Sequence, residues 1–146
     1  METLTFDIEI NAPQQKVWNV LWTKESYESW TKPFASGSTM TSDWTVGGRT
    51  NFHDGTGNGM ISTIERLHEP NEVIFKHLGM IQDGKEDLDS EEVKAWAGSL
   101  EKYQLTNSNG KTQLHVEVDM QAEYVDMMNK GFEQGLAIVK QLSEQA

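Results

Sequence analysis

The order of hydrophobic periodicities along the chain is the feature that most limits how it can fold. From Ser38 to Gln121, apolar residues recur at every second position in short segments separated by turn-forming residues, which is typical of antiparallel strands. The segment from Glu123 to Gln145 instead repeats apolar residues at spacings of three and four, which predicts a long amphipathic helix. A sheet with one apolar face needs a cover, and this helix is the only large one that the sequence offers.

The N-terminal part of the chain predicts one strand followed by short helices. Apolar and polar residues alternate over residues 4–10, so one face of this strand should be buried. Asn11 or Ala12 is expected to cap a helix whose first residue is Pro13, because proline loses no hydrogen bond at that position. A further helical turn or two is predicted around Glu25–Trp30.

The middle of the chain predicts strands joined by turns. The expected strands are Ser38–Trp44, Arg49–Asp54, Met60–His68, Glu72–Leu78, Trp96–Thr106 and Thr112–Gln121. The acidic stretch Gln82–Glu92 is predicted to be a mobile loop. In the predicted strand Trp96–Thr106, Trp96 and Leu100 would point to one face of the sheet and Tyr103 and Leu105 to the other. A bulge or a strong bend is therefore expected within this strand.

Length, charge and cysteine content limit the classes of protein that are possible. A chain of 146 residues is expected to form one domain, 1–146. It has no cysteine, which excludes disulfides and thiolate chemistry and fits a reducing cytoplasm. A net charge of −11 disfavours nucleic acid as a partner, and no apolar stretch is long enough for membrane insertion. No secretory signal segment is recognised.

Residues at ordered points of the chain match a known superfamily. They are Ile10-Asn11-Ala12-Pro13, Val17-Trp18, Tyr27, Trp30, Gly37-Ser38, Asp43-Trp44, Gly47-Gly48, Phe75-Lys76-His77, Trp96, Glu101-Lys102-Tyr103 and the final helix. Over nearly its whole length the chain resembles START-like, or SRPBCC, proteins, also called birch-allergen-like proteins. Within them it is most similar to the group homologous to the C-terminal domain of the activator of heat-shock protein 90 ATPase.

The resemblance implies an α+β helix-grip fold with an internal cavity. A curved antiparallel sheet of about six to seven strands would wrap around the C-terminal helix, with one or two short helices after the first strand. The cavity would lie between the sheet and this helix. Members of the superfamily include lipid and hormone carriers, polyketide cyclases and aromatases, and co-chaperone domains, so the fold by itself does not select a function.

The inward faces of the strands and the apolar face of the last helix would form the walls of this cavity. Aromatic and methionine side chains with a few polar tips suit a mostly apolar ligand, although the same residues could simply fill a solid core. The candidate ligand-binding residues are Met40, Trp44, Phe52, Met60, Phe75, His77, Trp96, Leu100, Tyr103, Met128 and Phe132.

Two histidines are candidates for proton transfer or for orienting a ligand. His77 lies within an apolar strand, and a hydrogen-bonded structural histidine is the simpler interpretation there. His53 lies beside a predicted turn and is the weaker candidate. No nucleophile elbow and no metal-binding histidine spacing appears, so no catalytic residue is predicted.

The segment from Asp54 to Glu65 nearly matches an EF-hand calcium loop. Gly59 and Glu65 occupy the sixth and twelfth positions as that loop requires. However, Thr56 stands at the third position, and both flanks alternate like strands where an EF-hand needs helices. A flexible hairpin is the better interpretation, and neither a metal nor another cofactor is predicted.

Three functions remain open from the sequence. The leading hypothesis is a small binding protein that holds an apolar or amphipathic molecule in the cavity. The second is a co-chaperone or protein-interaction domain, with a chaperone or other protein as its partner. The third is a cyclase-like or hydrolytic enzyme, with His77, Tyr103 and either His53 or Trp96 around the substrate. A monomer or a weak dimer is expected in each case.

Overall fold

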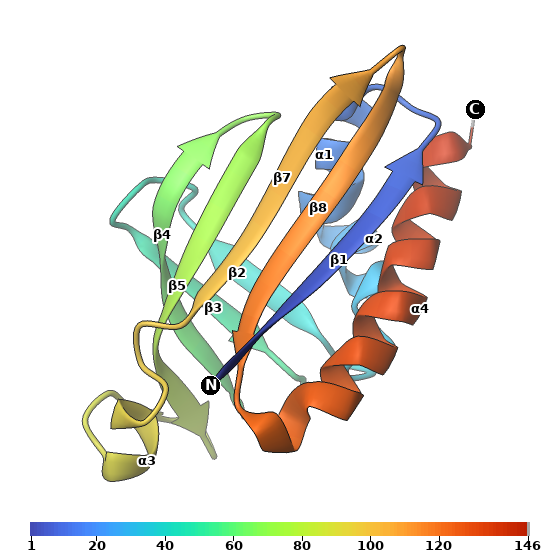
Figure 1. Ribbon diagram of the computed structural model, residues 1–146. Helices are drawn as coiled ribbons and strands as arrows, with labels where there is room; N and C mark the ends of the chain where they lie inside the picture. The colour runs from blue at the N-terminus through green and yellow to red at the C-terminus, as the bar shows by residue number, and fades with distance from the viewer. Residues whose placement is uncertain (146) are drawn as a thin grey trace.

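The computed structural model describes residues 1–145, in which one antiparallel sheet curves around a long C-terminal helix (Figure 1). The strands are β1 (Glu2–Ile10), β2 (Thr39–Ser42), β3 (Arg49–His53), β4 (Gly59–His68), β5 (Glu72–Gln82), β6 (Lys85–Asp87), β7 (Leu100–Ser108) and β8 (Lys111–Met120). The helical segments are α1 (Gln14–Trp22), α2 (Lys24–Trp30), α3 (Glu91–Lys94), the short 3-10 turn η1 (Ala122–Tyr124) and α4 (Val125–Glu144). The predicted α+β helix-grip fold is confirmed.

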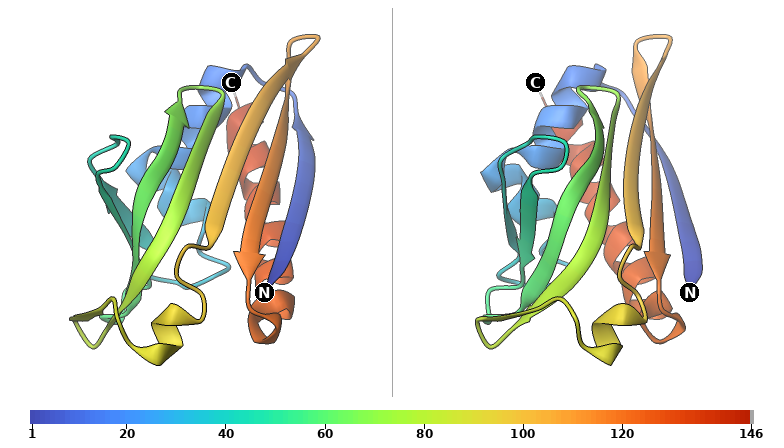
Figure 2. Two further views of the ribbon diagram at one scale, coloured as in Figure 1. Left: turned by 60° about the vertical axis from the view of Figure 1, so that its left-hand side comes forward. Right: turned by 90° about the vertical axis from the view of Figure 1, so that its left-hand side faces the viewer.

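The strand order places the first and the last strand side by side at one edge of the sheet. The order is β1-β8-β7-β5-β4-β3-β2, and β6 pairs with β5 beside this path. α1, α2 and α4 all lie on the same, concave face of the sheet, whereas α3 lies at one end of it (Figure 2). Among residues 1–145, no helix covers the opposite face, which agrees with the alternation of apolar and polar residues along the strands.

Alternating side chains build the core between the sheet and the helices. In β8, Leu114, Val116 and Val118 are buried, and the residues between them are more exposed. α4 buries Phe132, Leu136 and Val139 at the spacing expected of a helix face. Within residues 1–145, no helix is long and apolar enough to cross a membrane.

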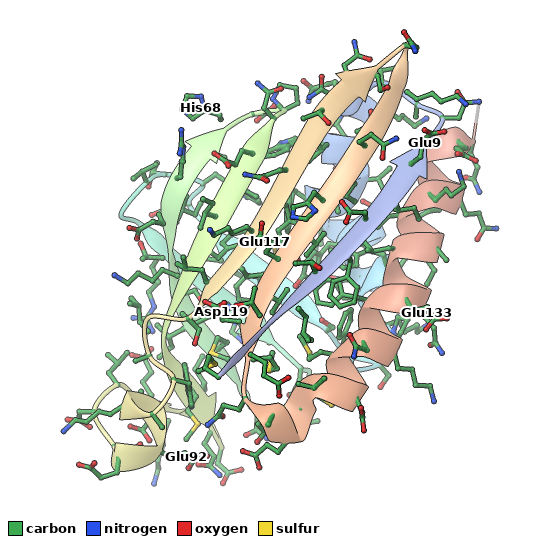
Figure 3. All side chains as sticks on the ribbon, in the orientation of Figure 1. Glu9, His68, Glu92, Glu117, Asp119 and Glu133 are labelled. Carbon is green, nitrogen blue, oxygen red and sulfur yellow. The ribbon has the colours of Figure 1, made fainter. Side chains whose placement is uncertain are left out.

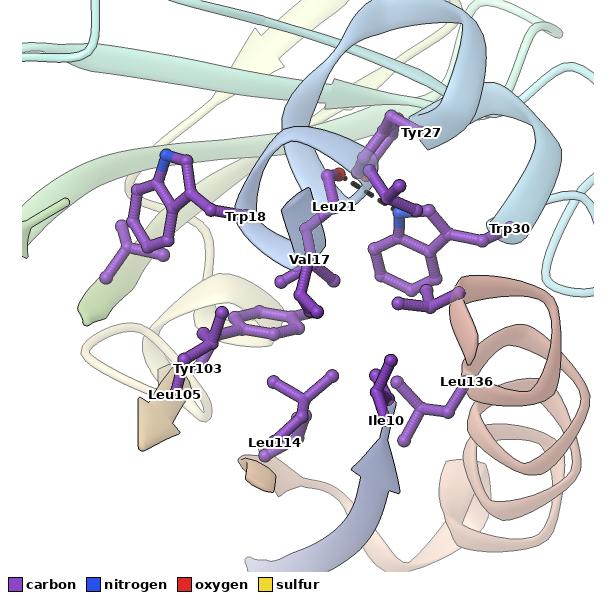
Figure 4. Close-up of a cluster of buried hydrophobic side chains, with 14 of the residues drawn as sticks. Ile10, Val17, Trp18, Leu21, Tyr27, Trp30, Tyr103, Leu105, Leu114 and Leu136 are labelled. Carbon is purple, nitrogen blue, oxygen red and sulfur yellow. Dashed lines mark hydrogen bonds between the residues drawn. The ribbon is translucent and has the colours of Figure 1, made fainter. Parts of the chain in front are cut away.

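The first two helices are tied together by a buried hydrogen bond. The indole Nε1 of Trp30 donates to the backbone carbonyl of Leu21 at 3.0 Å (Figure 4). This bond satisfies a polar group in the apolar interior and thereby fixes the angle between α1 and α2. Trp30 thus presents its ring to α4, where it forms part of the inner wall of the site described below.

The acidic stretch between residues 82 and 92 is ordered structure, so the predicted loop is wrong. Asp83 and Gly84 both have positive φ angles, 51° and 75°, which is the geometry of a tight hairpin turn. This turn extends β5 and pairs it with β6. The hydroxyl of Ser90 then accepts a hydrogen bond from the backbone N–H of Val93 at 3.2 Å and caps α3. The Asp-Gly pair was a hairpin signal in the sequence.

The predicted bulge in the strand Trp96–Thr106 is also wrong, because β7 begins only at Leu100. Trp96 belongs to the turn that follows α3, and its backbone N–H bonds to the carbonyl of Val93. Because Trp96 is outside the strand, no bulge is needed for Tyr103 and Leu105 to face the helices. Register shifts occur instead between β4 and β5, next to Ser62 and next to Ile64.

Several boundaries differ from the sequence prediction, most clearly those of α1, β2 and α4. Pro13 is the N-cap of α1, with an extended backbone, and is not its first helical residue. Trp44 lies beyond the end of β2 and has a φ of 54°, an uncommon conformation for a bulky side chain. The 3-10 turn η1 precedes α4, which therefore starts at Val125 and not at Glu123.

Candidate functional site

A cavity of about 620 Å³ lies between the inner face of the sheet, α2 and the first half of α4. Six of the seven methionines of the chain line it: Met1, Met60, Met80, Met120, Met127 and Met128. Eight aromatic residues also line it: Tyr27, Trp30, Phe34, Phe52, Trp96, Tyr103, Tyr124 and Phe132. Rigid aromatic rings and flexible thioethers together form an apolar surface that can adapt to its contents.

The cavity has a buried inner end and an open outer end. Trp30, Tyr103 and Phe132 at the inner end are almost completely buried. At the outer end, Tyr124 and Met127 are 41% and 53% exposed. The lining residues of this end come from α3, the β3–β4 hairpin and the start of α4. These segments lie at the lower end of the molecule in Figure 1.

The structure brings seven of the eleven predicted ligand-binding residues together around this cavity. They are Phe52, Met60, His77, Trp96, Tyr103, Met128 and Phe132. They come from β3, β4, β5, β7 and α4, and from the turn after α3. The cavity is therefore a product of the complete fold and not of any one local motif.

The other four predicted residues lie elsewhere. Phe75 is fully buried within an aromatic cluster, with its ring centroid 5.4 Å from that of Trp22. Trp44 packs on the outer side of the same cluster, 5.5 Å from Trp22, and Met40 packs against the core from β2. Leu100 has the opposite phase to Tyr103 in β7, so it faces away from the helices.

A chain of hydrogen bonds crosses the inner wall from β4 to β7. The hydroxyl of Ser62 and Nδ1 of His77 are 2.6 Å apart, and Nε2 of His77 is 3.2 Å from Oε1 of Glu101. The hydroxyl of Tyr103 donates to Oε2 of Glu101. If Ser62 donates to Nδ1, the proton of a neutral His77 lies on Nε2 and is shared with the carboxylate.

Two tyrosines beside Glu101 are held in the neutral form. Burial raises the pKa of Tyr103 well above its usual value, and the nearby charge of Glu101 adds to the effect. Burial likewise raises the pKa of Tyr27, with a smaller contribution from Glu101. The inner end of the cavity therefore presents two phenolic hydroxyls, one imidazole and one carboxylate among its apolar side chains.

Glu101 is the polar residue of this site that the sequence prediction missed. Its side chain is 17% exposed and that of His77 is 9% exposed, so both lie mostly out of water. The signal was present in the sequence, because Glu101 shares the phase of Tyr103 and Leu105, which are buried. A carboxylate at an inward-facing strand position is uncommon enough to indicate a site.

Ser62, His77 and Glu101 resemble a hydrolytic triad only superficially. Ser62 is 1% exposed and lies behind His77, outside the lining of the cavity. A substrate in the cavity would meet His77 and Glu101 before it could reach the hydroxyl of Ser62. The arrangement is suited to fixing the orientation of His77 and Glu101, because both ring nitrogens of His77 have a partner.

His53 and Asp54 border the cavity where β3 ends. The pKa of Asp54 lies below its usual value because its carboxylate accepts hydrogen bonds from the side chain and backbone of Thr56. The segment that resembled a calcium loop is the β3–β4 hairpin, with strands on both flanks as the alternation indicated.

A helix-grip sheet closed by a C-terminal helix over an apolar cavity defines the class of protein. Residues 11–144 match the family described as Activator of Hsp90 ATPase homolog 1-like protein, and the chain belongs to this family. The resemblance found in the sequence is therefore confirmed. No curated protein matches the chain significantly.

Solved structures show the same fold at low sequence identity. The Aha1 dimer from Colwellia psychrerythraea is 17% identical, covers 99% of this chain and 97% of its own, and has a TM-score of 0.72. A protein from Mesorhizobium loti is also 17% identical, with 97% and 96% covered and a TM-score of 0.74. A protein in the dynemicin biosynthetic locus is 14% identical, with 99% of this chain but 48% of its own covered and a TM-score of 0.71.

Proposed function

We propose that this protein binds an apolar or amphipathic small molecule in the cavity between the sheet and α4. The observation that carries the proposal is the cavity itself, about 620 Å³ in volume and lined by methionine and aromatic side chains. Sites for small molecules typically enclose about 300–1,000 Å³ and combine an apolar wall with a few polar groups. His77, Glu101, Tyr27 and Tyr103 supply those polar groups.

The arrangement of these polar groups favours ligand binding over catalysis as the role of the cavity. The hydrogen bonds within the wall hold His77 and Glu101 in fixed positions, which favours recognition of one orientation of a ligand. The serine of the set is covered by other groups. We therefore prefer a carrier or sensor of a small molecule over a cyclase-like or hydrolytic enzyme.

A native mass spectrum of gently purified protein tests the proposal, with two matched variants. Met128 lines the cavity from α4, so Met128→Trp should fill part of it, whereas its exposed neighbour Asn129 allows the control Asn129→Trp. We expect an additional mass that is lost on denaturation in the wild type and in the control variant, and lost from Met128→Trp. A bare protein in all three samples, after incubation with a cell extract, would contradict the proposal.

A protein-interaction role is the second candidate, and the family to which the chain belongs favours it. Tyr124 and Met127 expose large apolar side chains at the start of α4, where a partner protein could contact them. Pull-down by the wild type, but not by Tyr124→Ala, of a heat-shock protein 90 chaperone would support this role. Equal capture by both proteins would contradict it.

A further inference from the structure

The charges that line the cavity are mostly of one sign. Four acidic residues border it: Asp54, Glu92, Glu101 and Asp119. The chain has twelve lysine and arginine residues, and within residues 1–145 none of their side chains is part of the lining. Met1 borders the cavity with its apolar side chain.

We propose that the ligand is an organic cation, a molecule with an apolar body and a protonated amine that pairs with the carboxylate of Glu101. This inference rests on the proposed binding function and specifies the chemistry of its ligand. The positive group would bind at the inner end of the cavity, and the apolar body would contact the methionine and aromatic side chains of its walls.

Glu101 has the position and the spare bonding capacity for this role. A carboxylate can accept about four hydrogen bonds, and Glu101 accepts two, from His77 and Tyr103. Its side chain is largely removed from water, which makes a charged partner valuable because the solvent compensates little of its charge. An ammonium group is a compact donor of up to three hydrogen bonds and can use the remaining acceptor sites.

The surrounding rings favour the same kind of ligand. Trp30 and Tyr103 have ring centroids 6.3 Å apart and both line the inner end of the cavity, where the hydroxyl of Tyr103 bonds to Glu101. The faces of aromatic rings attract cations, most strongly when water is excluded. Tyr27 keeps a neutral hydroxyl near Glu101, so it neither adds a competing negative charge nor supplies a positive one. A carboxylate or phosphate ligand would meet only repulsion from Glu101.

The outer end adds attraction at longer range. Glu92 lies on α3, toward the same end of the sheet as the opening (Figure 3). Asp119 lies near the end of β8, where its carboxylate accepts hydrogen bonds from the backbone N–H of Leu100 and the hydroxyl of Thr3, so it adds only to the overall negative charge. Asp54 borders the cavity from the β3–β4 hairpin, and hydrogen bonds from Thr56 favour its charged form. Together with a net charge of −11, these groups should speed the approach of a cation and slow that of an anion.

The experiment compares three probes of nearly equal size that differ in charge: naphthylmethylamine, naphthylmethanol and naphthoate. Binding is followed by NMR of protein labelled with ¹³C at the methionine methyl groups. Six methionines line the cavity, and Met40, which lies on β2 outside the lining, is an internal control. At about pH 7 and physiological salt, the amine should bind about ten-fold or more tightly than the alcohol, and naphthoate most weakly.

Two variants locate the effect. Glu101→Gln should weaken binding of the amine much more than binding of the alcohol, so that the two dissociation constants come to within about two-fold of each other. Glu117→Gln removes the same charge from the outer face of β8, where Glu117 contacts His115, and should change neither constant by more than about two-fold. The preference of the wild type for the amine is measured independently of either variant.

The outcomes separate this inference from the proposed function. If the alcohol and naphthoate bind as tightly as the amine, the cavity takes apolar molecules but the preference for a cation is refuted. The same conclusion follows if Glu101→Gln folds normally and retains the full preference for the amine. If none of the probes shifts the lining methyl groups at millimolar concentration, binding of small molecules in this cavity is itself refuted.

Discussion

Gly135 of α4 lies directly against the backbone carbonyl of Trp30 at the end of α2. A Cβ atom placed on Gly135 would lie 2.7 Å from that carbonyl oxygen and 3.2 Å from the indole ring of Trp30. One turn earlier, a Cβ on Gly131 would lie 2.4 Å from the ring of Phe34. These two glycines allow α2 and the segment after it to approach α4 closely enough to close the inner end of the cavity.

Gly135→Ala should therefore destabilise the protein, although alanine is the better helix former. The gain in helix propensity is about 1 kcal/mol, whereas forcing a methyl group against a backbone carbonyl costs about 1–3 kcal/mol. We expect a net loss in the free energy of unfolding, measured by urea denaturation. Gln134→Ala, at the exposed position before it, should change stability by less than about 0.5 kcal/mol. An unchanged or increased midpoint for Gly135→Ala would contradict the close packing of α2 on α4.

Ser62→Ala should destabilise the protein because it leaves Nδ1 of a buried His77 without its partner. The expected cost is about 1–3 kcal/mol, since an unsatisfied buried polar group loses its solvation as well as its bond. In a His77→Phe background the same substitution should cost much less, because no polar atom then remains to be satisfied. Equal costs in the two backgrounds, measured by chemical denaturation, would show that Ser62 and His77 do not interact as described.

The periodicities of the sequence predicted most of the fold. Leu114, Val116 and Val118 alternate without interruption, and α4 repeats its apolar residues over several turns, so each local pattern agrees with the tertiary role of its element. The short elements were missed because their signals are brief. β6 depends on a single Asp-Gly turn, and α3 is only 4 residues long.

The polar part of the site depends on register, which periodicity does not specify. Between Ile61 and Ser62 the pairing of β4 with β5 shifts by one residue, so that Ser62 lies opposite His77. β7 pairs Phe75 with Glu101, which places Glu101 diagonally beside His77. A single sequence shows that these residues face inward, but it does not show that they meet. Their contact follows from the tertiary pairing of three strands.

The stability contributed by His115 should depend on pH. Hydrogen bonds to Asp7, at 2.6 Å, and to Glu117, at 2.9 Å, raise the pKa of His115 above its usual value. A raised pKa means that the stabilisation is fully present below about pH 6.5, the usual pKa of histidine, and is lost as the pH rises through the higher value of the folded state.

His115→Gln should accordingly destabilise the protein more at about pH 5.5 than at about pH 9. The effect should stay below about 1 kcal/mol, because the side chains are partly exposed and water screens the charges. The free energy of unfolding of both proteins is measured by urea denaturation across this range. The Asp7→Asn background is the control, since it removes the first of the two partners and should reduce the dependence on pH. A difference between the two proteins that grows with pH would contradict the assignment.

Tyr27 and Tyr103 should resist ionisation in the folded protein. Burial raises the pKa of both hydroxyls, and the charge of Glu101 adds to it. Below about pH 10, the usual pKa of tyrosine, both hydroxyls are neutral in the folded and the unfolded chain, and the fold keeps its full stability. Above that pH the free energy of unfolding should fall, because the unfolded chain loses these protons first. At about pH 11 the native protein should therefore show phenolate absorbance from no more than one of its three tyrosines. Unfolding at the same pH should add the phenolate absorbance of the remaining tyrosines.

Glu101→Gln should lower the pH at which Tyr27 and Tyr103 ionise, because it removes the nearby negative charge, whereas Glu117→Gln should leave that pH unchanged. Phenolate absorbance from all three tyrosines in folded protein would show that the inner end of the cavity is open to water.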